Sequence, residues 1–273
     1  MEFDEVARRG LVLLGCGKMG GAMLDGWLAG GLPASAVTVL DPKPSAGLEA
    51  RVSAGLNLNG ELPADPAVAI LAVKPQMMGA ALPQLAALGG GGTLFVSIAA
   101  GTTLATLGDA LGAGTPIVRA MPNTPAAVGR GITALIGNAS VDAAGLDLAE
   151  NLLSAVGRTV RIDTESEIDA ITALSGSGPA YVFLLIEAMA AAGVAQGLAP
   201  ELAQSLARAT VIGAGALAES AAETPAAQLR TDVTSPGGTT AAALQVLMAD
   251  EGLVDLMSRA IAAAAARSRE LAV

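Results

Sequence analysis

Short apolar runs, each followed by a polar or glycine-rich break, occupy the chain up to about residue 162. The runs cover residues 11–14, 37–40, 67–73, 93–98, 117–120 and 133–136, and helix-like segments lie between them. Short, fully apolar runs are typical of strands in a parallel sheet, because helices cover both faces of such a sheet. The first part of the chain therefore predicts alternating strands and helices around a doubly wound sheet.

The pattern changes from Glu165 onward, where the strand signal disappears. Alanine-rich stretches run over residues 167–174, 179–195, 200–220 and 252–271. Pro179 and Pro200 each stand where a helix accepts a proline, in its first turn. Alanine and glycine supply little core volume, so the wide apolar faces of these helices predict a subunit interface. A self-contained helical bundle is the alternative.

The first apolar run ends at a glycine-rich hexapeptide, Gly15-Cys16-Gly17-Lys18-Met19-Gly20, and an amphipathic stretch to Ala29 follows. In a strand–GxGxxG–helix unit the first glycine permits a tight turn, and the second lets backbone N–H groups approach a pyrophosphate. The third lets helix and strand pack closely. A glycine-rich turn without a ligand is the alternative. The predicted fold class is α/β: a Rossmann-like dinucleotide-binding domain over residues 1–163 and an all-α C-terminal dimerisation domain over residues 164–273.

Ligands of this architecture lie beyond the carboxyl ends of the strands, which selects four further segments. Asp41 follows the second strand, where an acid accepts hydrogen bonds from the adenosine ribose and favours NADH. Lys43 could instead pair with a 2′-phosphate, so the choice between NADPH and NADH stays open. The other three segments lie at the ends of later predicted strands. They are a cation before a proline at residues 73–75, small residues at 97–101, and a proline-bracketed turn at 119–125. The cofactor-binding candidates are Gly15, Gly17, Lys18, Met19, Gly20, Asp41, Val73, Lys74, Pro75, Ala99, Ala100, Met121, Asn123 and Thr124.

Two polar, glycine-rich interruptions stand out in the helical half, at residues 175–179 and 232–240. The second contains Gly237-Gly238-Thr239-Thr240 just before a predicted helix. Free N–H groups and hydroxyls at a helix start suit a small carboxylate, by the same physics that binds phosphate in the first domain. An inter-helix turn with an ordinary threonine N-cap is the alternative.

Composition excludes several classes of site. The formal net charge of −10, without a basic stripe, argues against a nucleic-acid partner. The chain has no histidine, which excludes a Ser-His-Asp triad, histidine metal ligation and an imidazole proton shuttle. The lone Cys16 forms no internal disulfide and leaves no zinc site, so we interpret it as a packing residue and expect no bound metal.

Hydrophobic residues make up 52% of the chain, a share high enough to raise the question of a membrane span. Residues 181–198 form the one long apolar stretch, and Glu187 near its centre costs about 2.5–3.5 kcal/mol on insertion scales. We expect a helix buried on all sides by other helices or by another subunit, and no membrane span.

The N-terminal region resembles a lipoprotein signal, since Arg8-Arg9 precede an apolar run and Cys16 follows it. A secretory core, however, needs about 7–15 apolar residues, and the run at residues 11–14 has four. We therefore expect an untargeted, cytoplasmic chain.

The chain resembles pyrroline-5-carboxylate reductases from end to end. The resemblance rests on residues 15–20, 72–75, 121–125, 173–181 and 233–240, of which the last three motifs are long and specific. It implies reduction of 1-pyrroline-5-carboxylate to L-proline by NADPH or NADH, the last step of proline biosynthesis. It also implies a helix-exchanged homodimer, with assembly up to a decamer left open.

The same resemblance assigns the substrate to the second glycine-rich loop. The residues expected there are Ser235, Gly237, Gly238, Thr239, Thr240 and Glu223, with Thr240 as the catalytic residue. We expect the N–H groups of Gly238 and Thr239 to bind the carboxylate and the Thr240 hydroxyl to bond the ring nitrogen. Asp232 departs from the neutral residue usual in this family, and Asp41 is less typical of members that favour NADPH.

Two rival functions remain at this stage. A β-hydroxyacid dehydrogenase shares the fingerprint and the helical dimer domain, but it needs a lysine acid/base in its second domain. The lysines of this chain are Lys18, Lys43 and Lys74, so that proton carrier is missing. A non-catalytic nucleotide sensor with a helical dimerisation half is the other rival, and it leaves the loop at residues 235–240 unexplained.

Overall fold

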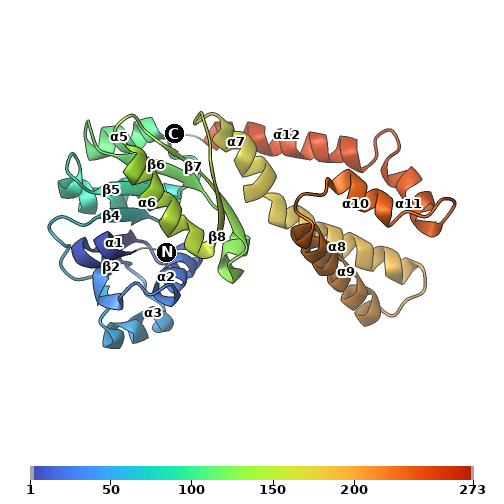
Figure 1. Ribbon diagram of the computed structural model, residues 1–273, viewed down its shortest axis with the longest axis horizontal. Coiled ribbons are helices and arrows are strands. Elements are labelled where there is room, and N and C mark those ends of the chain that lie inside the picture. Colours follow the sequence, from blue (N-terminus) through green and yellow to red (C-terminus); the bar gives the residue numbers. More distant parts are fainter. Residues whose placement is uncertain (1–2, 272–273) are drawn as a thin grey trace. The chain divides into compact units, whose positions relative to one another are not determined.

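The computed structural model describes residues 3–271, and its first part is an eight-stranded sheet between two layers of helices (Figure 1). The strands follow one another in the order β3-β2-β1-β4-β5-β6-β7-β8 across the sheet. Each predicted apolar run from residue 11 to residue 136 contains a strand. The strands are β1 (Leu11–Leu14), β2 (Val37–Leu40), β3 (Asn57–Leu58), β4 (Val68–Leu71), β5 (Leu94–Ser97), β6 (Ile117–Met121), β7 (Gly131–Gly137) and β8 (Gly157–Arg161).

The first six strands are parallel, in the order typical of a dinucleotide-binding sheet. The order reverses between β1 and β4, which are hydrogen-bonded neighbours with Leu11 opposite Val68. Because these strands are parallel, the segments that follow β1, β2, β4, β5 and β6 all emerge at one edge. Ligands of open α/β sheets bind at this edge, beside the point where the strand order reverses.

The expectation of a parallel sheet is wrong for the last two strands. β7 pairs with β6 in the antiparallel direction, with Val118 opposite Gly137, and β8 runs parallel to β7. The β6–β7 connection holds only the short 3₁₀ helix η4 (Thr124–Val128), whereas a parallel crossover needs a dozen or more residues. Strand β8 was not predicted, because its alternating polar residues form no apolar run; such residues are typical of an edge strand.

The two faces of the sheet carry separate apolar cores. Alternate side chains of β1 divide between them: Leu11 and Leu13 pack with α2 and α6, and Val12 and Leu14 pack with α4 and α5. This alternation is why every residue of β1 is buried. The helices of this part are α1 (Asp4–Arg9), α2 (Lys18–Ala29), α3 (Ala46–Ala50), α4 (Pro75–Ala81), α5 (Leu104–Leu111) and α6 (Ala143–Leu153); the remaining 3₁₀ segments are η1 (Ala34–Ala36), η2 (Arg51–Ala54), η3 (Leu82–Leu88) and η5 (Ser154–Val156).

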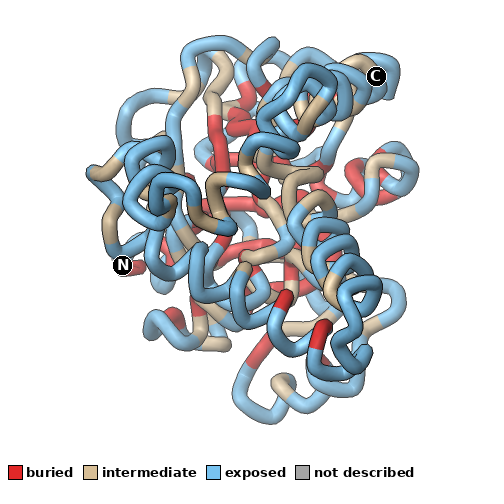
Figure 2. Tube along the Cα trace, turned by 90° about the vertical axis from the view of Figure 1, so that its right-hand side faces the viewer, coloured by how far each residue is buried: buried red, intermediate tan, exposed pale blue. Residues whose placement is uncertain are grey.

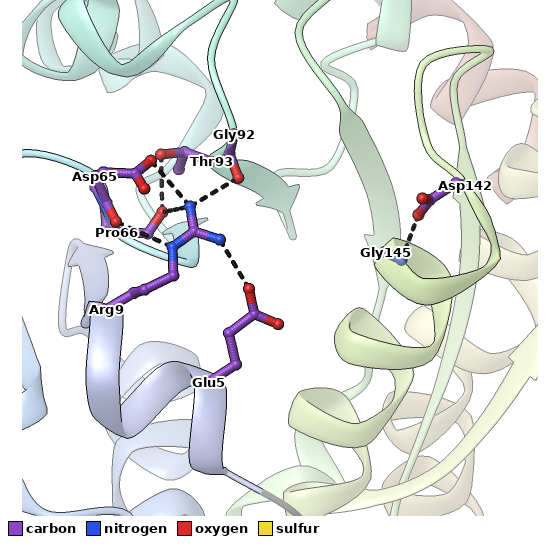
Figure 3. A network of polar contacts seen from close by, with 8 residues as sticks. All are labelled: Glu5, Arg9, Asp65, Pro66, Gly92, Thr93, Asp142 and Gly145. Atoms are coloured by element: carbon purple, nitrogen blue, oxygen red, sulfur yellow. Dashed lines mark hydrogen bonds and ion pairs between the residues drawn. The ribbon is translucent and has the colours of Figure 1, made fainter.

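A polar network closes the opposite, amino-terminal edge of the sheet (Figure 3). The Arg9 guanidinium donates to the Asp65 carboxylate at 2.9 Å, to the Gly92 carbonyl at 3.1 Å and to the Glu5 carboxylate at 2.7 Å. Asp142 caps α6 by accepting a hydrogen bond from the Gly145 N–H at 2.8 Å. Arg9 thus joins the turns that precede β4 and β5, and its donors serve the fold at this edge.

The chain divides into two compact units. The first contains the residues up to Gly176 together with those from Ala265 onward, and the second is Ser177–Ala264. The change from strands to helices falls after β8, near the predicted boundary between residues 163 and 164, whereas the units divide after Gly176. Helix α7 (Glu167–Ile171) and a π-helical segment, Thr172–Gly176, therefore belong to the first unit.

The second unit consists of helices, as expected. They are α8 (Gly178–Ala195), α9 (Pro200–Ser220), α10 (Ala226–Asp232), α11 (Thr239–Leu247) and most of α12 (Leu253–Leu271), with Pro179 and Pro200 in the first turns of their helices. α8 and α9 pack against each other through small residues, and Ala203 and Ala207 of α9 are buried. The antiparallel hairpin is thus a close pair of helices with little core of its own.

Other helices of the same chain do not bury residues 181–198, which leaves cover by another subunit as the remaining part of that expectation. No residue of α8 is buried, and Phe183 and Leu184 are 60% and 63% exposed. Figure 2 shows the helical coils mostly pale blue with tan stretches, whereas all residues of β1 and β4 are buried. Within residues 3–271, the helical run Glu167–Ala195 is long and apolar enough for a membrane span by length and composition, with none of its most apolar window buried.

Candidate functional site

The glycine-rich turn between β1 and α2 has the geometry that its sequence predicts. Gly15 adopts a φ of +89°, and a Cβ there would lie 2.8 Å from Val73 Cγ1. A Cβ on Gly20 would lie 2.4 Å from the Gly15 carbonyl oxygen. The first glycine therefore makes the turn and the third allows the helix to approach the strand.

Gly17 differs from its two neighbours in the motif. A Cβ at this position would meet no atom within 4 Å, and its φ of −71° is accessible to any residue. Gly17 is the N-cap residue of α2 and has no side chain to bond the first free N–H groups of the helix. The fold places no demand for glycine here, and the open space leaves room for the close approach of a ligand.

Asp41 is fixed against the glycine-rich turn from the end of β2. Its Oδ2 accepts a hydrogen bond from the Cys16 N–H at 2.8 Å, and its Oδ1 accepts one from the Lys43 N–H at 2.8 Å. Asn59 adds a two-way amide bridge to the Asp41 backbone, with both distances 2.8 Å. The carboxylate thus joins the β1 and β2 turns, which is a structural role that the spacing alone does not show.

Two cavities meet at Asp41. One has a volume of about 240 Å³ and is mainly apolar; it is lined by Leu14, Leu40, Asp41, Pro42, Asn59, Val73, Met77, Ala80, Ala81 and Gln84. The other has a volume of about 450 Å³ and carries three cationic side chains; it is lined by Cys16, Gly17, Lys18, Gly21, Leu24, Asp25, Asp41, Lys43, Ser45, Gly47, Leu48 and Arg51. An apolar slot beside a cationic cavity suits the adenine and phosphate parts of a dinucleotide.

Burial raises the pKa of the Cys16 thiol to about 11, and the Asp41 charge adds to the shift. At pH 8 the thiolate fraction is then about 100-fold below that of an unperturbed cysteine. We expect iodoacetamide to alkylate Cys16 correspondingly slowly at pH 8 and faster as the pH approaches 11, measured by mass spectrometry against N-acetylcysteine. Equal rates for the two thiols at pH 8 would contradict the inert, packing role of Cys16.

The candidates from later strands reach the same edge. Lys74 is the N-cap residue of α4 and Pro75 opens that helix, directly after β4. Ala99 and Ala100 follow β5, and Ala99 is buried. Met121 is the last residue of β6, and Asn123 and Thr124 follow it. Asn123 Oδ1 accepts from the Ile132 N–H at 2.9 Å, and its Nδ2 donates to the Ser175 carbonyl at 3.2 Å. The structure brings these segments together through strand order, although they are far apart in sequence.

The loop at residues 235–240 opens α11. Gly237 has a φ of +69°, and Gly238 is the extended N-cap residue without a side-chain cap. The Gly238 N–H donates to the Ser235 carbonyl at 3.0 Å, so in the folded chain it is not the free donor that the sequence led us to expect. Within residues 3–271, the N–H groups of Thr239 and Thr240 have no protein acceptor. The helix start thus offers free donors one residue later than expected.

Two acidic candidates near this loop do not join it. The Asp232 carboxylate accepts a hydrogen bond from Gln228 Nε2 at 2.7 Å, along its own helix. Glu223 is exposed in the turn before α10, and within the described residues it makes no hydrogen bond to residues 235–240. In the same part of the chain, no group of three or more metal-ligating side chains occurs.

Known proteins match the chain over nearly its whole length. A family model described as pyrroline-5-carboxylate reductase dimerisation matches residues 165–271, and one described as NADP oxidoreductase coenzyme F420-dependent matches residues 10–101. A pyrroline-5-carboxylate reductase from Pseudomonas aeruginosa is 44% identical over 96% of both chains. The chain belongs to the pyrroline-5-carboxylate reductase family. A relative from Vibrio alginolyticus is 36% identical, covering 96% of this chain and 97% of that one.

Solved structures of pyrroline-5-carboxylate reductases have the same fold. The enzyme from Coxiella burnetii superposes with a TM-score of 0.90 at 35% identity, covering 97% of this chain and 99% of that one. The Plasmodium falciparum enzyme with NADP bound has a TM-score of 0.82 at 28% identity, covering 98% and 99%. The chain is thus an NAD(P)H-dependent oxidoreductase that reduces 1-pyrroline-5-carboxylate to L-proline, the last step of proline biosynthesis, and it forms homo-oligomers.

Proposed function

We propose that residues 235–240 hold the substrate of this reductase. The free N–H groups of Thr239 and Thr240, at the positive end of α11, bind the carboxylate, and Ser235 and Gly237 shape the turn that presents them. The half-buried Thr240 hydroxyl bonds the ring nitrogen. The observation that carries this assignment is an uncapped helix start whose donors lack protein acceptors.

The chemistry needs no imidazole. The cofactor, when bound, supplies a hydride to the imine carbon, the C=N electron pair moves to the nitrogen, and the already protonated nitrogen becomes a secondary amine. The residues of the chain therefore orient the two reactants and keep the ring nitrogen hydrogen-bonded. This explains how a chain without histidine can be an efficient reductase.

The direct test is oxidation of reduced nicotinamide with 1-pyrroline-5-carboxylate as the acceptor. We expect steady loss of nicotinamide absorbance and formation of stoichiometric L-proline, with NADPH and NADH compared at equal concentration. Binding of the cofactor without proline formation would favour a nucleotide sensor and overturn the proposed site.

We also propose that the cationic cavity selects NADPH. Both Asp41 oxygens already accept backbone hydrogen bonds, and the Arg51 guanidinium pairs with Asp25. The exposed Lys43 ammonium forms no ion pair within residues 3–271 and lies at the same cavity. A 2′-phosphate is the ligand group that would pair with it, because Lys binds phosphate as a point charge.

Lys43→Ala should weaken NADPH binding about tenfold, the effect of losing one charge-assisted contact, and leave NADH binding within about twofold. The measurement is the dissociation constant of each cofactor by nicotinamide fluorescence, and Lys43→Arg should retain the preference. An equal loss for both cofactors would mean that Lys43 does not contact the 2′-phosphate.

We propose that the exposed apolar faces of α8 and α9 form the homodimer interface. Large side chains such as Leu184 and Ile212 are exposed by 63% and 64% in the single chain. Contiguous exposed apolar faces are typical of protein–protein interfaces. Light scattering in the absence of detergent should give at least twice the chain mass of 26.7 kDa. We also propose assembly up to a decamer, which the same molar-mass measurement tests. A cytoplasmic location is a further part of this proposal.

A further inference from the structure

The segment between β8 and α8 is held at the carboxyl edge of β6 by a shielded ion pair. Glu165 Oε1 accepts from Arg119 Nη1 at 2.6 Å and from the Leu104 N–H at 2.8 Å. The Arg119 side chain is only 6% exposed, and Leu104 is the first residue of α5. One carboxylate oxygen thus joins three segments that follow or belong to β5, β6 and β8.

A second link lies farther along the same segment. Asn123 Nδ2 donates to the Ser175 carbonyl at 3.2 Å, and Asn123 Oδ1 accepts from the Ile132 N–H. Next to Ser175, a Cβ on Gly176 would lie only 2.8 Å from Met121 Cε. The loop after β6 and the end of the π-helical segment are therefore in direct contact.

Ser175, whose carbonyl accepts the hydrogen bond from Asn123, lies in a rare type of helix. Residues Thr172–Gly176 are π-helical, and such turns are frequent at functional sites. The helical unit, which carries the proposed substrate loop, begins at the next residue, Ser177. Asp169, just before the π segment, accepts from Ser268 Oγ of α12 at 2.6 Å, so the returning end of the chain is bonded to the same segment.

We propose that Asn123 is a positioning residue for hydride transfer. Its amide fixes the point at which the chain leaves the sheet, next to Met121 and Thr124, two of the expected cofactor-binding residues. Both of its polar atoms make hydrogen bonds inside the protein, so we expect it to act on the reactants through Ser175 and Ile132, in place of the cofactor contact expected from the sequence. Displacing reacting atoms by about 1 Å can cost 100-fold in rate, so loss of this link should slow the chemical step. The inference rests on the proposed function.

The test replaces the donor and keeps the acceptor. Asn123→Asp retains an oxygen for the Ile132 N–H but places a carboxylate against the Ser175 carbonyl. Asn138→Asp is the matched control, because Asn138 makes the same kind of bridge at the amino end of β6. Its Nδ2 donates to the Thr115 carbonyl at 2.9 Å, and its Oδ1 accepts from the Ile117 N–H at 3.2 Å. We expect single-turnover hydride transfer, at saturating NADPH and 1-pyrroline-5-carboxylate, to fall at least about tenfold only in Asn123→Asp.

The dissociation constant for NADPH separates positioning from direct contact. It should stay within about twofold in Asn123→Asp, whereas a parallel loss of NADPH affinity would overturn the positioning role. A rate equal to that of Asn138→Asp would overturn it as well. Gly176→Ala, which pushes Met121 from the other side of the same contact, should slow hydride transfer even if Asn123→Asp does not fold. A wild-type chain that does not oxidise NADPH with this substrate would overturn the proposed function and this inference with it.

Discussion

Gly17→Val is expected to raise the dissociation constant for NADPH more than about 100-fold without lowering the stability of the fold. The side chain would fit the protein, since a Cβ at Gly17 meets no atom within 4 Å. It would, however, fill the space through which a pyrophosphate reaches the N–H groups at the start of α2, where contact distances are about 2.9 Å. Loss of binding would then come from the ligand and not from the protein.

The measurement combines NADPH titration with thermal unfolding followed by the sole, fully buried tryptophan, Trp27. Gly108→Val is the matched control, because Gly108 lies in α5 and its Cβ also meets no atom within 4 Å. That control should bind NADPH like the wild type. Gly20→Ala should instead destabilise the protein, because its Cβ would lie 2.4 Å from a backbone oxygen. Retained NADPH binding in a folded Gly17→Val variant would show that the turn is not the pyrophosphate site.

Thr240→Ala should lower kcat at least about 100-fold while leaving NADPH affinity unchanged. In the proposed site the hydroxyl bonds the ring nitrogen as it becomes an amine, an interaction that strengthens as the hydride is transferred. An interaction of this kind appears in kcat and kcat/KM together. The fingerprint expected to bind the cofactor belongs to the other compact unit, so the affinity for NADPH should not respond.

Thr240→Ser is the control for this prediction, because it keeps a hydroxyl at the same position of α11. It should retain most of the activity, and Thr240→Val, which keeps the shape and loses the hydroxyl, should behave like Thr240→Ala. Both measurements use steady-state kinetics with L-proline as the quantified product. Unaltered turnover in Thr240→Val would remove this hydroxyl from the mechanism.

The local sequence was sufficient to predict the elements whose physical cause lies within a single segment. The runs of β1 and β2, the helix over Lys18–Ala29 and the first-turn prolines of α8 and α9 follow from period, propensity and backbone geometry. The roles of Gly15 and Gly20 were also predictable, because a turn and a close helix approach exclude a side chain. The direction of β7 was not, because it depends on which edge of the sheet accepts the strand.

The candidate sites divide in the same way. Spacing placed Asp41 at the end of β2, but only the folded chain shows its carboxylate bonded to the Cys16 N–H. The Gly237-Gly238-Thr239-Thr240 motif predicted a helix start, but only the folded chain shows that the Gly238 N–H donates to the Ser235 carbonyl within the turn. Contacts across long separations, such as Asn123 with Ser175, leave no periodic trace in the sequence.

The sequence by itself determined the two-part architecture, the glycine fingerprint, the exclusion of imidazole chemistry and the family resemblance, because each depends on residue identity over a short span. The tertiary structure decided which fingerprint glycine has open space around it, which backbone donors stay free, and which side chains are engaged within the protein. Those outcomes depend on hydrogen bonds and close packing between segments that are distant along the chain, and pairing of this kind is fixed only when the whole sheet forms.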